Sequence, residues 1–228
     1  MPTVGGIVVS TGSEASGRRT LLDVIDELAR PINASDTTIR ALAGDAFRAA
    51  VRTMNRKGNW PWELQDENIT QTANSPYTTV TGAIKKPLAM YYLDSASLPF
   101  ERIAYAEYED VVEKYDLSIS SRPTQYSVPN LFETGQIRWV QIPTSAENCR
   151  FTYYRVTPAP RVEAETVEVP DFAIEAYMAF AWYELAKRLP AMQTRLPLAI
   201  ANGDAMLAFR EISAHVNQPG DRMQYHDN

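Results

Sequence analysis

A glycine-containing stretch near the N-terminus is the first candidate for chemistry, because its layout is that of a phosphate-binding loop. The apolar residues 7–9 precede a loop between Gly12 and Gly17, and a helical pattern follows. A phosphate-binding loop, however, has Lys and then Ser or Thr directly after its second glycine, whereas two arginines follow Gly17. No alternation of strands and helices follows that would build a parallel sheet. The sequence therefore predicts a flexible arm over residues 1–19.

The titratable side chains form no recognisable catalytic or metal-binding pattern. His215 and His226 have no acidic or cysteine partner at ligand spacing. Cys149 is the only cysteine and has no nearby histidine, so we expect it to be buried like a small hydrophobic residue. Carboxylate pairs such as Glu109 and Glu113 could serve a glycoside hydrolase, but the sequence singles out none of its many acids. We expect no catalytic residue, no metal and no cofactor.

A Trp-Pro-Trp motif at residues 60–62 directly follows a long helical pattern. Proline fixes the backbone between two indole rings, so the motif would form a rigid knuckle where a helical part meets a β part. The plainer interpretation, that both rings are core at a domain junction, predicts the same location. We expect the following large side chains at a subunit interface or a domain junction: Trp60, Trp62, Trp139, Tyr153, Tyr154, Phe209, Met223 and Tyr225.

The charge of the chain argues against a protein that grips nucleic acid. Its 228 residues carry a formal net charge of −6, which repels phosphates. Residues 101–116 hold six acidic and two basic side chains, whereas residues 36–57 hold five basic and two acidic ones. Opposite charge on separate segments suits contacts between subunits, although two solvated helix faces would have the same composition.

No segment predicts a membrane anchor. The longest apolar run, residues 176–183, is far shorter than the roughly 18 residues that a spanning helix needs. The N-terminus lacks the basic-then-apolar order of a secretion signal, and a single cysteine fits a cytoplasmic origin. We therefore expect a soluble protein without membrane contact.

Two helices are predicted before the Trp-Pro-Trp motif. The first begins at a Thr20 cap, with a carboxylate at its third position, and stops at Pro31. The second follows a cap at Ser35 or Asp36 and has apolar residues at helical spacing up to residue 54. Gly58 should end it in a left-handed conformation.

Two further helices are predicted after residue 169. Pro170 begins the third, and apolar residues surround its axis as far as residue 189, so this helix must be enclosed. The simplest packing buries the apolar stripe of the second helix against it. The fourth helix spans about residues 198–215, and its apolar positions are Ile200, Met206, Leu207, Phe209 and Ile212.

The region between the two helix pairs is predicted to be mainly β. Its β-like runs are residues 68–72, 77–81, 88–93, 136–142 and 150–157. The last two flank a polar connection and predict a hairpin, whereas residues 104–115 predict a helix. Both faces of the hairpin carry large apolar side chains, so its second face should meet another sheet or a neighbouring subunit.

The predicted fold class is therefore α+β, with a helical bundle domain and an inserted, mainly antiparallel β domain that forms a small barrel or sandwich. The helical domain is discontinuous, over residues 20–61 and 170–216, and the β domain covers residues 62–169. Residues 1–19 form the flexible arm and residues 217–228 a C-terminal tail. We expect the arm and the tail to become ordered only on assembly, since neither can bury enough apolar surface alone.

Four segments carry a likeness to a known family. They are residues 56–62 (RKGNWPW), residues 122–126 (RPTQY), the expected hairpin with Ile137, Trp139, Ile142, Pro143 and the run 151–156 (FTYYRV), and the acidic lead into the third helix at residues 165–171. Their order, over about residues 35–189, resembles that of the bacteriophage head-to-tail adaptor proteins, also called tail tubular, tail accessory or head-completion proteins. The N-terminal arm and the last helix have no counterpart.

The resemblance implies a structural virion protein and not an enzyme. Such a protein is made in the host cytoplasm and forms a homo-oligomeric ring, commonly of twelve copies, at the head-tail junction. The helical part would dock on the portal protein, and the β part would face the next tail or nozzle protein. DNA would pass through the channel during packaging and ejection without sequence-specific binding. If acidic segments line this channel, they would keep phosphates from adhering.

Three other functions remain open at this point. A different tail-completion or baseplate subunit could use the same layout. A tail-associated enzyme that cleaves peptidoglycan would use two of the acidic residues. A carbohydrate-binding module would use exposed rings of the β region, although core is the plainer interpretation of these rings.

Overall fold

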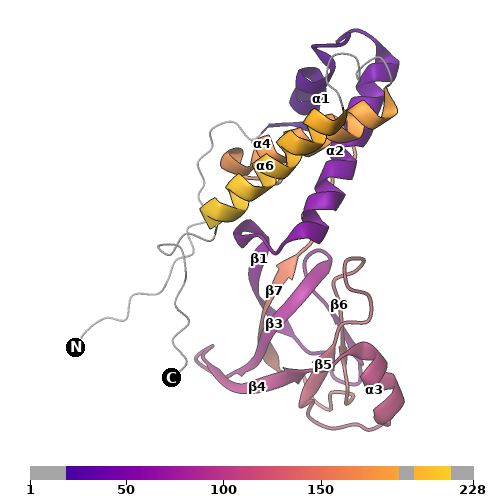
Figure 1. Ribbon diagram of the computed structural model, residues 1–228. Helices are drawn as coiled ribbons and strands as arrows, with labels where there is room; N and C mark the ends of the chain where they lie inside the picture. Colours follow the sequence, from indigo (N-terminus) through magenta and orange to yellow (C-terminus); the bar gives the residue numbers. More distant parts are fainter. Residues whose placement is uncertain (1–18, 190–197, 217–228) are drawn as a thin grey trace, which may run out of the picture.

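The computed structural model describes residues 19–189 and 198–216, which form an α+β fold. Within these ranges lie five α-helices, one short 3-10 helix and seven strands in a single, mostly antiparallel sheet that is nearly closed into a barrel. Most helices gather at one end of the molecule and the sheet occupies the other (Figure 1). The predicted fold class is confirmed. In the described ranges no helix is both long and apolar enough to cross a membrane.

The first two helices begin at the predicted caps. In α1 (Leu21–Ala29), the Thr20 side chain accepts a hydrogen bond from the Asp23 backbone, and the Asp23 carboxylate accepts one from the Thr20 backbone. In α2 (Thr37–Lys57), the Asp36 carboxylate accepts hydrogen bonds from the first-turn amides. Gly58 ends α2 as predicted, but its backbone is extended and not left-handed. Its carbonyl group turns toward Lys85 instead of capping the helix.

The first of the two C-terminal helices packs against α2, and the second packs against the first. α4 (Asp171–Arg188) lies between α2 and α6 (Leu198–Val216), which confirms the predicted packing of the second helix on the third. The predicted apolar side of α6 is only partly correct: Ile212 is buried and Phe209 half-buried, whereas Ile200, Met206 and Leu207 are exposed. Ala201 and Ala205 take the buried positions instead, because small side chains let α6 approach α4 closely.

A hydrophobic core lies among these helices. Its members on α2 include Phe47, Val51 and Met54, all almost fully buried, and Tyr177 and Leu185 come from α4. Each such side chain contributes roughly 1.5–3 kcal/mol on burial. Val167 and Val169, which precede α4, belong to the same core. The backbone of that stretch also hydrogen-bonds to the start of α1, for example from Val167 N to the Arg19 carbonyl at 2.9 Å.

The sheet is built from strands that are far apart in the sequence. The strands are β1 (Leu64–Thr70), β2 (Tyr77–Thr79), β3 (Ile84–Leu93), β4 (Pro99–Tyr105), β5 (Gln125–Ser127), β6 (Gln136–Trp139) and β7 (Asn148–Arg155). Their order is β1-β7-β3-β4-β5-β6-β2, and only the β4–β5 pair is parallel. The short 3-10 helix η1 (Pro61–Glu63) precedes β1, and α3 (Tyr108–Lys114) lies between β4 and β5.

The predicted hairpin between residues 136–142 and 150–157 is wrong. β6 pairs with β2 and β5, whereas β7 pairs with β1 and β3, so the two strands are not neighbours. β7 lies between β1 and β3, and the residues between β6 and β7 cross from one part of the sheet to another. The helix predicted at residues 104–115 begins only at Tyr108, since Ala104 and Tyr105 belong to β4.

The second hydrophobic core fills the barrel. It includes Ile137, Trp139, Phe151 and Tyr153, which are fully buried. The apolar residues on the opposite faces of these strands are covered within the same chain to different degrees: Val140 is buried, whereas Tyr154 and Val156 are half-buried. Large apolar residues therefore occur on both faces of these strands because the sheet is strongly curved and the chain partly covers its outer face.

Glu67 of β1 joins the two edges of the barrel. Its carboxylate accepts hydrogen bonds from the backbone N and the hydroxyl of Thr81, at 3.0 and 3.1 Å, just beyond β2. The Tyr153 hydroxyl lies 3.1 Å from the same carboxylate and 2.7 Å from the Thr81 carbonyl oxygen. Side-chain hydrogen bonds thus replace the missing backbone ladder between β1 and β2.

Candidate domain junction and assembly surfaces

The described residues offer no cluster that could hold a metal ion. Within residues 19–189 and 198–216, no group of three or more His, Cys, Asp or Glu side chains could hold a metal ion. Cys149 is fully buried in the barrel core, as predicted, and burial raises the pKa of its thiol to about 12. A thiol with this pKa stays protonated near neutral pH and is a poor nucleophile. His215 and His226 have side chains outside the described residues.

The most elaborate polar site lies where the helices meet the barrel. Glu63 of η1 and Lys85 of β3 form an ion pair with Nζ and Oε2 2.5 Å apart, and their side chains are only 0% and 3% exposed. The other carboxylate oxygen of Glu63 accepts a hydrogen bond of 2.9 Å from the Thr157 hydroxyl, and the Trp60 backbone N donates to Oε2 at 3.1 Å. Lys85 also donates to the Gly58 carbonyl.

Each element that enters this junction is therefore tied to the others. Asn55, near the end of α2, exchanges two hydrogen bonds with the Thr157 backbone, at 2.9 and 3.0 Å. Thr157 lies two residues after the end of β7, so these bonds connect α2 to the exit from the sheet. Burial raises the pKa of Glu63 and lowers the pKa of Lys85, and the ion pair offsets part of both shifts.

The Trp-Pro-Trp motif covers one side of the junction. Trp60 and Trp62 stack with ring centroids 5.3 Å apart and planes only 1° from parallel. Trp60 also meets Phe209 of α6 edge-on at 5.8 Å, and Trp62 meets Phe172 of α4 at 5.7 Å. The Trp60 ring N–H donates to the Met54 carbonyl at 3.1 Å, which fixes the ring against the end of α2. The motif thus connects η1 with α2, α4 and α6.

The structure brings three of the eight candidate interface residues together. Trp60, Trp62 and Phe209 meet at the junction, whereas Trp139 and Tyr153 lie in the barrel core. The Trp139 ring N–H donates to the Thr78 hydroxyl at 2.9 Å, and Tyr153 stacks on Phe151 with centroids 4.7 Å apart. Tyr154 is half-buried on the outer face of β7. Met223 and Tyr225 lie outside the described residues.

The charged members of the junction escaped the sequence-based prediction. Glu63 follows the Trp-Pro-Trp motif and Lys85 precedes a second lysine, so each resembles an ordinary surface residue. Only the pairing of β3 with β7 carries Lys85 toward Glu63, and that pairing joins strands about sixty residues apart. The one signal in the sequence for a buried charge was the position of Glu63, directly after the Trp-Pro-Trp motif.

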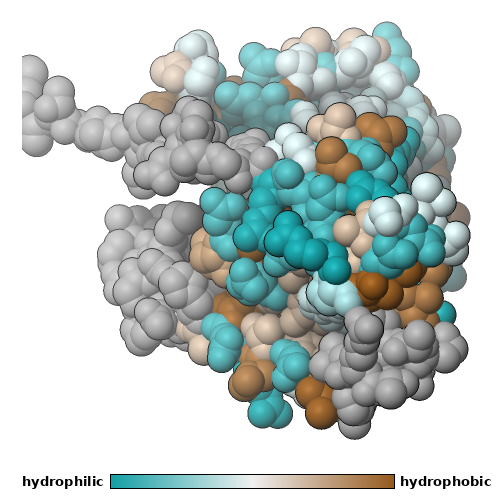
Figure 2. All heavy atoms as spheres, turned by 90° about the horizontal axis from the view of Figure 1, so that it is seen from above, coloured by the Kyte–Doolittle hydropathy of each residue, from teal (hydrophilic) through white to brown (hydrophobic). Residues whose placement is uncertain are grey.

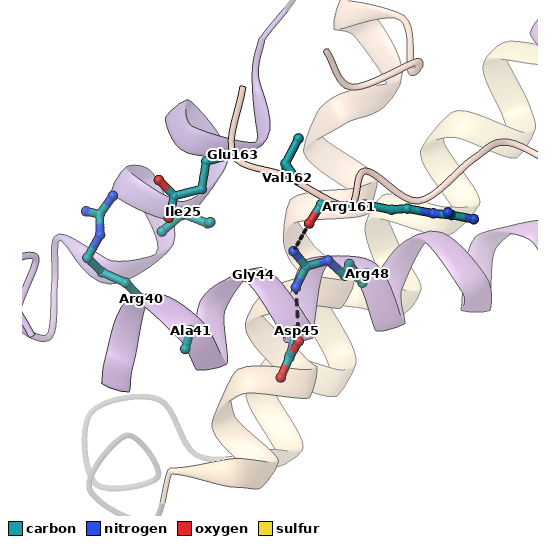
Figure 3. A pocket seen from close by; sticks show the side chains of 9 residues that line it. All are labelled: Ile25, Arg40, Ala41, Gly44, Asp45, Arg48, Arg161, Val162 and Glu163. Atoms are coloured by element: carbon teal, nitrogen blue, oxygen red, sulfur yellow. Dashed lines mark hydrogen bonds and ion pairs between the residues drawn. The ribbon is translucent and has the colours of Figure 1, made fainter. Parts of the chain in front are cut away.

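A shallow depression lies on α2 beside α1. It has a volume of about 400 Å³ and is lined by Ile25, Arg40, Ala41, Gly44, Asp45, Arg48, Arg161, Val162 and Glu163. Figure 3 shows that Arg48 reaches the carbonyl of Arg161 and the carboxylate of Asp45. Arg40 pairs with Asp26 at 2.5 Å. Because Arg40 and Arg48 already have partners within the chain, neither is free to bind a ligand in this depression.

Two groups of exposed like charges lie on different elements, a basic one on α2 and an acidic one on α3. On α2, Arg48, Arg52 and Arg56 lie one turn apart along one face, and Arg52 and Arg56 are exposed and form no hydrogen bond or ion pair with the described residues. On α3, Glu109 and Glu113 are likewise exposed and unpaired within the described chain. Seen from above the helical end, hydrophilic residues cover much of the surface, with separate hydrophobic spots among them (Figure 2).

Exposed apolar side chains occur at both ends. At the helical end, Phe172 and Leu207 are each 56% exposed. At the barrel end, Leu98 and Phe100 are exposed around the turn between β3 and β4, and Val112 is exposed on α3. Such side chains are common singly, but groups of them mark surfaces that meet partners.

A scan against models of protein families found no match, and a search of curated proteins found no significant relative.

Proposed function

We propose that the protein is a structural component of a phage particle, a head-to-tail connector adaptor that joins the portal to the tail. The observation that carries this proposal is the junction around Glu63, Lys85 and the stacked Trp60 and Trp62 rings, which holds the helical end and the barrel in one orientation. An adaptor must transmit position between two partners, so a stiff joint between two surfaces is the feature that it needs.

The division of the chain into domains is part of this proposal. Separate hydrophobic cores in the helices and in the barrel support a discontinuous helical domain interrupted by an inserted β domain. The proposed bounds are residues 20–61 and 170–216 for the helical domain and 62–169 for the β domain, and Val167 and Val169 at the end of the β segment pack in the helical core. In this arrangement the chain crosses between the domains twice. The Asn55 to Thr157 hydrogen bonds join the two crossings, which supports a joint that resists rotation.

Exposed apolar groups at both ends support two different partners. The helical end would dock on the portal protein, and the barrel end would meet the downstream tail or nozzle protein. Leu98 and Phe100 around the β3–β4 turn are suited to insertion into a groove of that downstream protein, since exposed apolar side chains gain most when a partner buries them.

Separated charge supports a homo-oligomeric ring. Arg52 and Arg56 are spaced by one helical turn, and so are Glu109 and Glu113, so the two pairs can face each other across a contact between copies. The two like-charged glutamates repel each other by roughly 0.2–0.5 kcal/mol in an isolated chain, and a basic neighbour would relieve this repulsion. The number of copies, commonly twelve, comes from the resemblance to the adaptor family alone.

The proposal places the protein at the head-tail junction of the virion, with DNA passing through the ring without sequence-specific binding. The net charge of −6 supports a channel that repels phosphates. Tight, salt-sensitive binding of duplex DNA by the purified protein would contradict this part.

The decisive experiment is mass photometry of the purified full chain, alone and mixed with the portal protein of the same virus. We expect a ring-sized species, or a ring that forms on the portal, and no hydrolysis of peptidoglycan in parallel assays. A chain that stays monomeric under both conditions, and that binds no isolated tail structure, would overturn the proposal.

A further inference from the structure

A row of three side chains crosses β5, β6 and β2 on one face of the sheet. The strand register pairs Ser127 with Arg138, and Arg138 with Tyr77. Residues directly opposite each other on neighbouring strands present their side chains on the same face. The next pair along, Tyr126 and Trp139, belongs to the barrel core. The row that contains Arg138 therefore points away from that core.

Arg138 is buried although no described residue neutralises its charge. Only 8% of its surface is exposed, and its guanidinium lies 5.1 Å from the centroid of the Tyr77 ring. Within residues 19–189 and 198–216 it has no ion pair, and its Nε atom has no hydrogen-bond acceptor. Arg122, by contrast, is more exposed and still pairs with both Glu101 and Glu147. Burial of an unpaired charge is strongly unfavourable.

Two neutral polar groups beside Arg138 also lack partners. The hydroxyl of Ser127 is fully buried and makes no hydrogen bond. The side-chain oxygen of Gln125, two residues earlier and hence on the same face, is buried without a donor. Because most buried polar groups in proteins are hydrogen-bonded, three such groups on two paired strands indicate a place completed by something outside the chain.

We propose that Arg138 receives the carboxylate of an Asp or Glu side chain from a partner protein chain. The planar guanidinium can hold both oxygens of a carboxylate. Tyr77 keeps the guanidinium in place through its ring face. The small remaining exposure suits one inserted side chain, whereas a nucleic acid backbone needs an open groove, and the net charge of −6 repels it.

This site deepens the proposed function and rests on it, because the carboxylate arrives only when the particle assembles. It also implies that the isolated chain carries an unrelieved penalty at Arg138. Such a residue reduces the stability of the free subunit and is retained for the assembled state.

The test begins with the Arg138→Met variant of the full chain. Methionine keeps an unbranched apolar stem without a charge, so we expect the midpoint of thermal unfolding of the isolated chain to rise by roughly 2–4 °C. In the same preparation, assembly with wild-type portal and tail partners should weaken at least tenfold. Arg138→Lys, which keeps the charge but loses the planar guanidinium with its paired donors, should assemble with intermediate strength. Arg102→Met, at an exposed arginine of β4, is the matched control and should change neither quantity.

A second measurement does not depend on assembly. The side-chain Nε–H resonance of Arg138 in nitrogen-15-labelled wild-type chain should shift on addition of sodium acetate, and shift less with sodium chloride of equal ionic strength. The absence of an acetate-specific shift would overturn the proposal. A lower unfolding midpoint of Arg138→Met would also overturn it, because it would mean that the chain already satisfies the guanidinium. Unchanged assembly of that variant, or binding of duplex DNA that depends on Arg138, would overturn it as well.

Failure of the adaptor function itself would be recognised separately. In that case the wild-type chain would form no ring and join no portal, whatever the behaviour of its variants. Retention of the acetate-specific shift would then still support a carboxylate site at Arg138.

Discussion

Glu63 and Lys85 form a buried ion pair that no sequence pattern announces. Transfer of both charges from water into the junction is costly, and the pair is stable only because Thr157, Trp60 and the Gly58 carbonyl supply further hydrogen bonds. Removal of one partner leaves the other charge buried and unpaired. The pair is therefore the most sensitive single contact between the helices and the barrel.

We predict that Lys85→Met lowers the free energy of unfolding by about 3–5 kcal/mol. Urea unfolding followed by tryptophan fluorescence would measure the change, since Trp60 and Trp62 lie beside the pair. The double variant Glu63→Gln with Lys85→Met should recover part of the loss because no charge remains buried. Lys86→Met, at the exposed neighbouring lysine, should change the free energy by less than about 0.5 kcal/mol. Equal free energies of unfolding for Lys85→Met and Lys86→Met would contradict this account.

The Lys85→Met variant should also depend on pH in a defined direction. Burial already raises the pKa of Glu63 above its ordinary value of 4.5, and Lys85 limits the rise. Without Lys85, the folded chain binds more protons than the unfolded chain in the pH range above 4.5. The free energy of unfolding should therefore fall as pH rises from 4.5 through the raised pKa of Glu63. Unfolding curves at pH 5 and pH 7 would show a less stable protein at pH 7, and the opposite order would refute the assignment.

Two glycines show how the same substitution depends on the element that contains it. A Cβ atom at Gly135 would lie 2.3 Å from the Gly82 carbonyl oxygen and 2.5 Å from that of Val80, because β6 begins against the turn between β2 and β3. At Gly203, on the exposed side of α6, a Cβ atom would meet nothing within 4 Å. The first glycine permits close approach of two backbones, whereas the second only weakens a helix.

We predict that Gly135→Ala destabilises the chain by about 1–3 kcal/mol, and that Gly203→Ala stabilises it by about 0.5–1 kcal/mol. Thermal unfolding of the two variants beside the wild type would test both signs in one experiment. If Gly135→Ala were neutral, the described approach of β6 to the β2–β3 turn would be incorrect.

The helices could be predicted from local patterns more fully than the strands. The Thr20 and Asp36 caps and the apolar spacing of α2 act within a few residues of the chain, and the structure confirms them. Strand pairing depends on contacts between distant segments, and for this reason the expected hairpin of β6 with β7 was wrong. The strands β4 and β5 were both missed, because β4 begins with exposed and charged residues and buries only Ile103, and β5 has only three residues.

The charge distribution of the whole molecule predicts how copies meet. α2 belongs to the helical end and α3 to the barrel end (Figure 1), so a contact between their charged side chains would join two copies head to tail. Such heterologous contacts close into rings or extend into filaments. In the assembled state, Arg52 and Arg56 of one copy would face Glu109 and Glu113 of the next.

We predict that reversal of either face weakens self-assembly at least tenfold, because it places like charges together. The two variants are Arg52→Glu with Arg56→Glu, and Glu109→Lys with Glu113→Lys. An equimolar mixture of them should assemble again, and so should one chain that carries all four substitutions. Mass photometry at low and high salt would follow the change, with Lys86→Glu and Arg102→Glu together as the control. Assembly that tolerates each reversal would exclude this contact.

The sequence by itself determined the α+β class, the caps and apolar faces of the first helices, the enclosed character of α4 and the burial of Cys149. These features follow from short-range periodicity and composition, which are read along the chain. Only the tertiary structure decided the strand order, the Glu63–Lys85 ion pair, the hydrogen bonds from Thr81 to Glu67 and the lack of an ion-pair partner for Arg138. Each of these depends on which distant residues the barrel brings into contact, and a charged residue looks the same in the sequence whether it meets water or a buried partner.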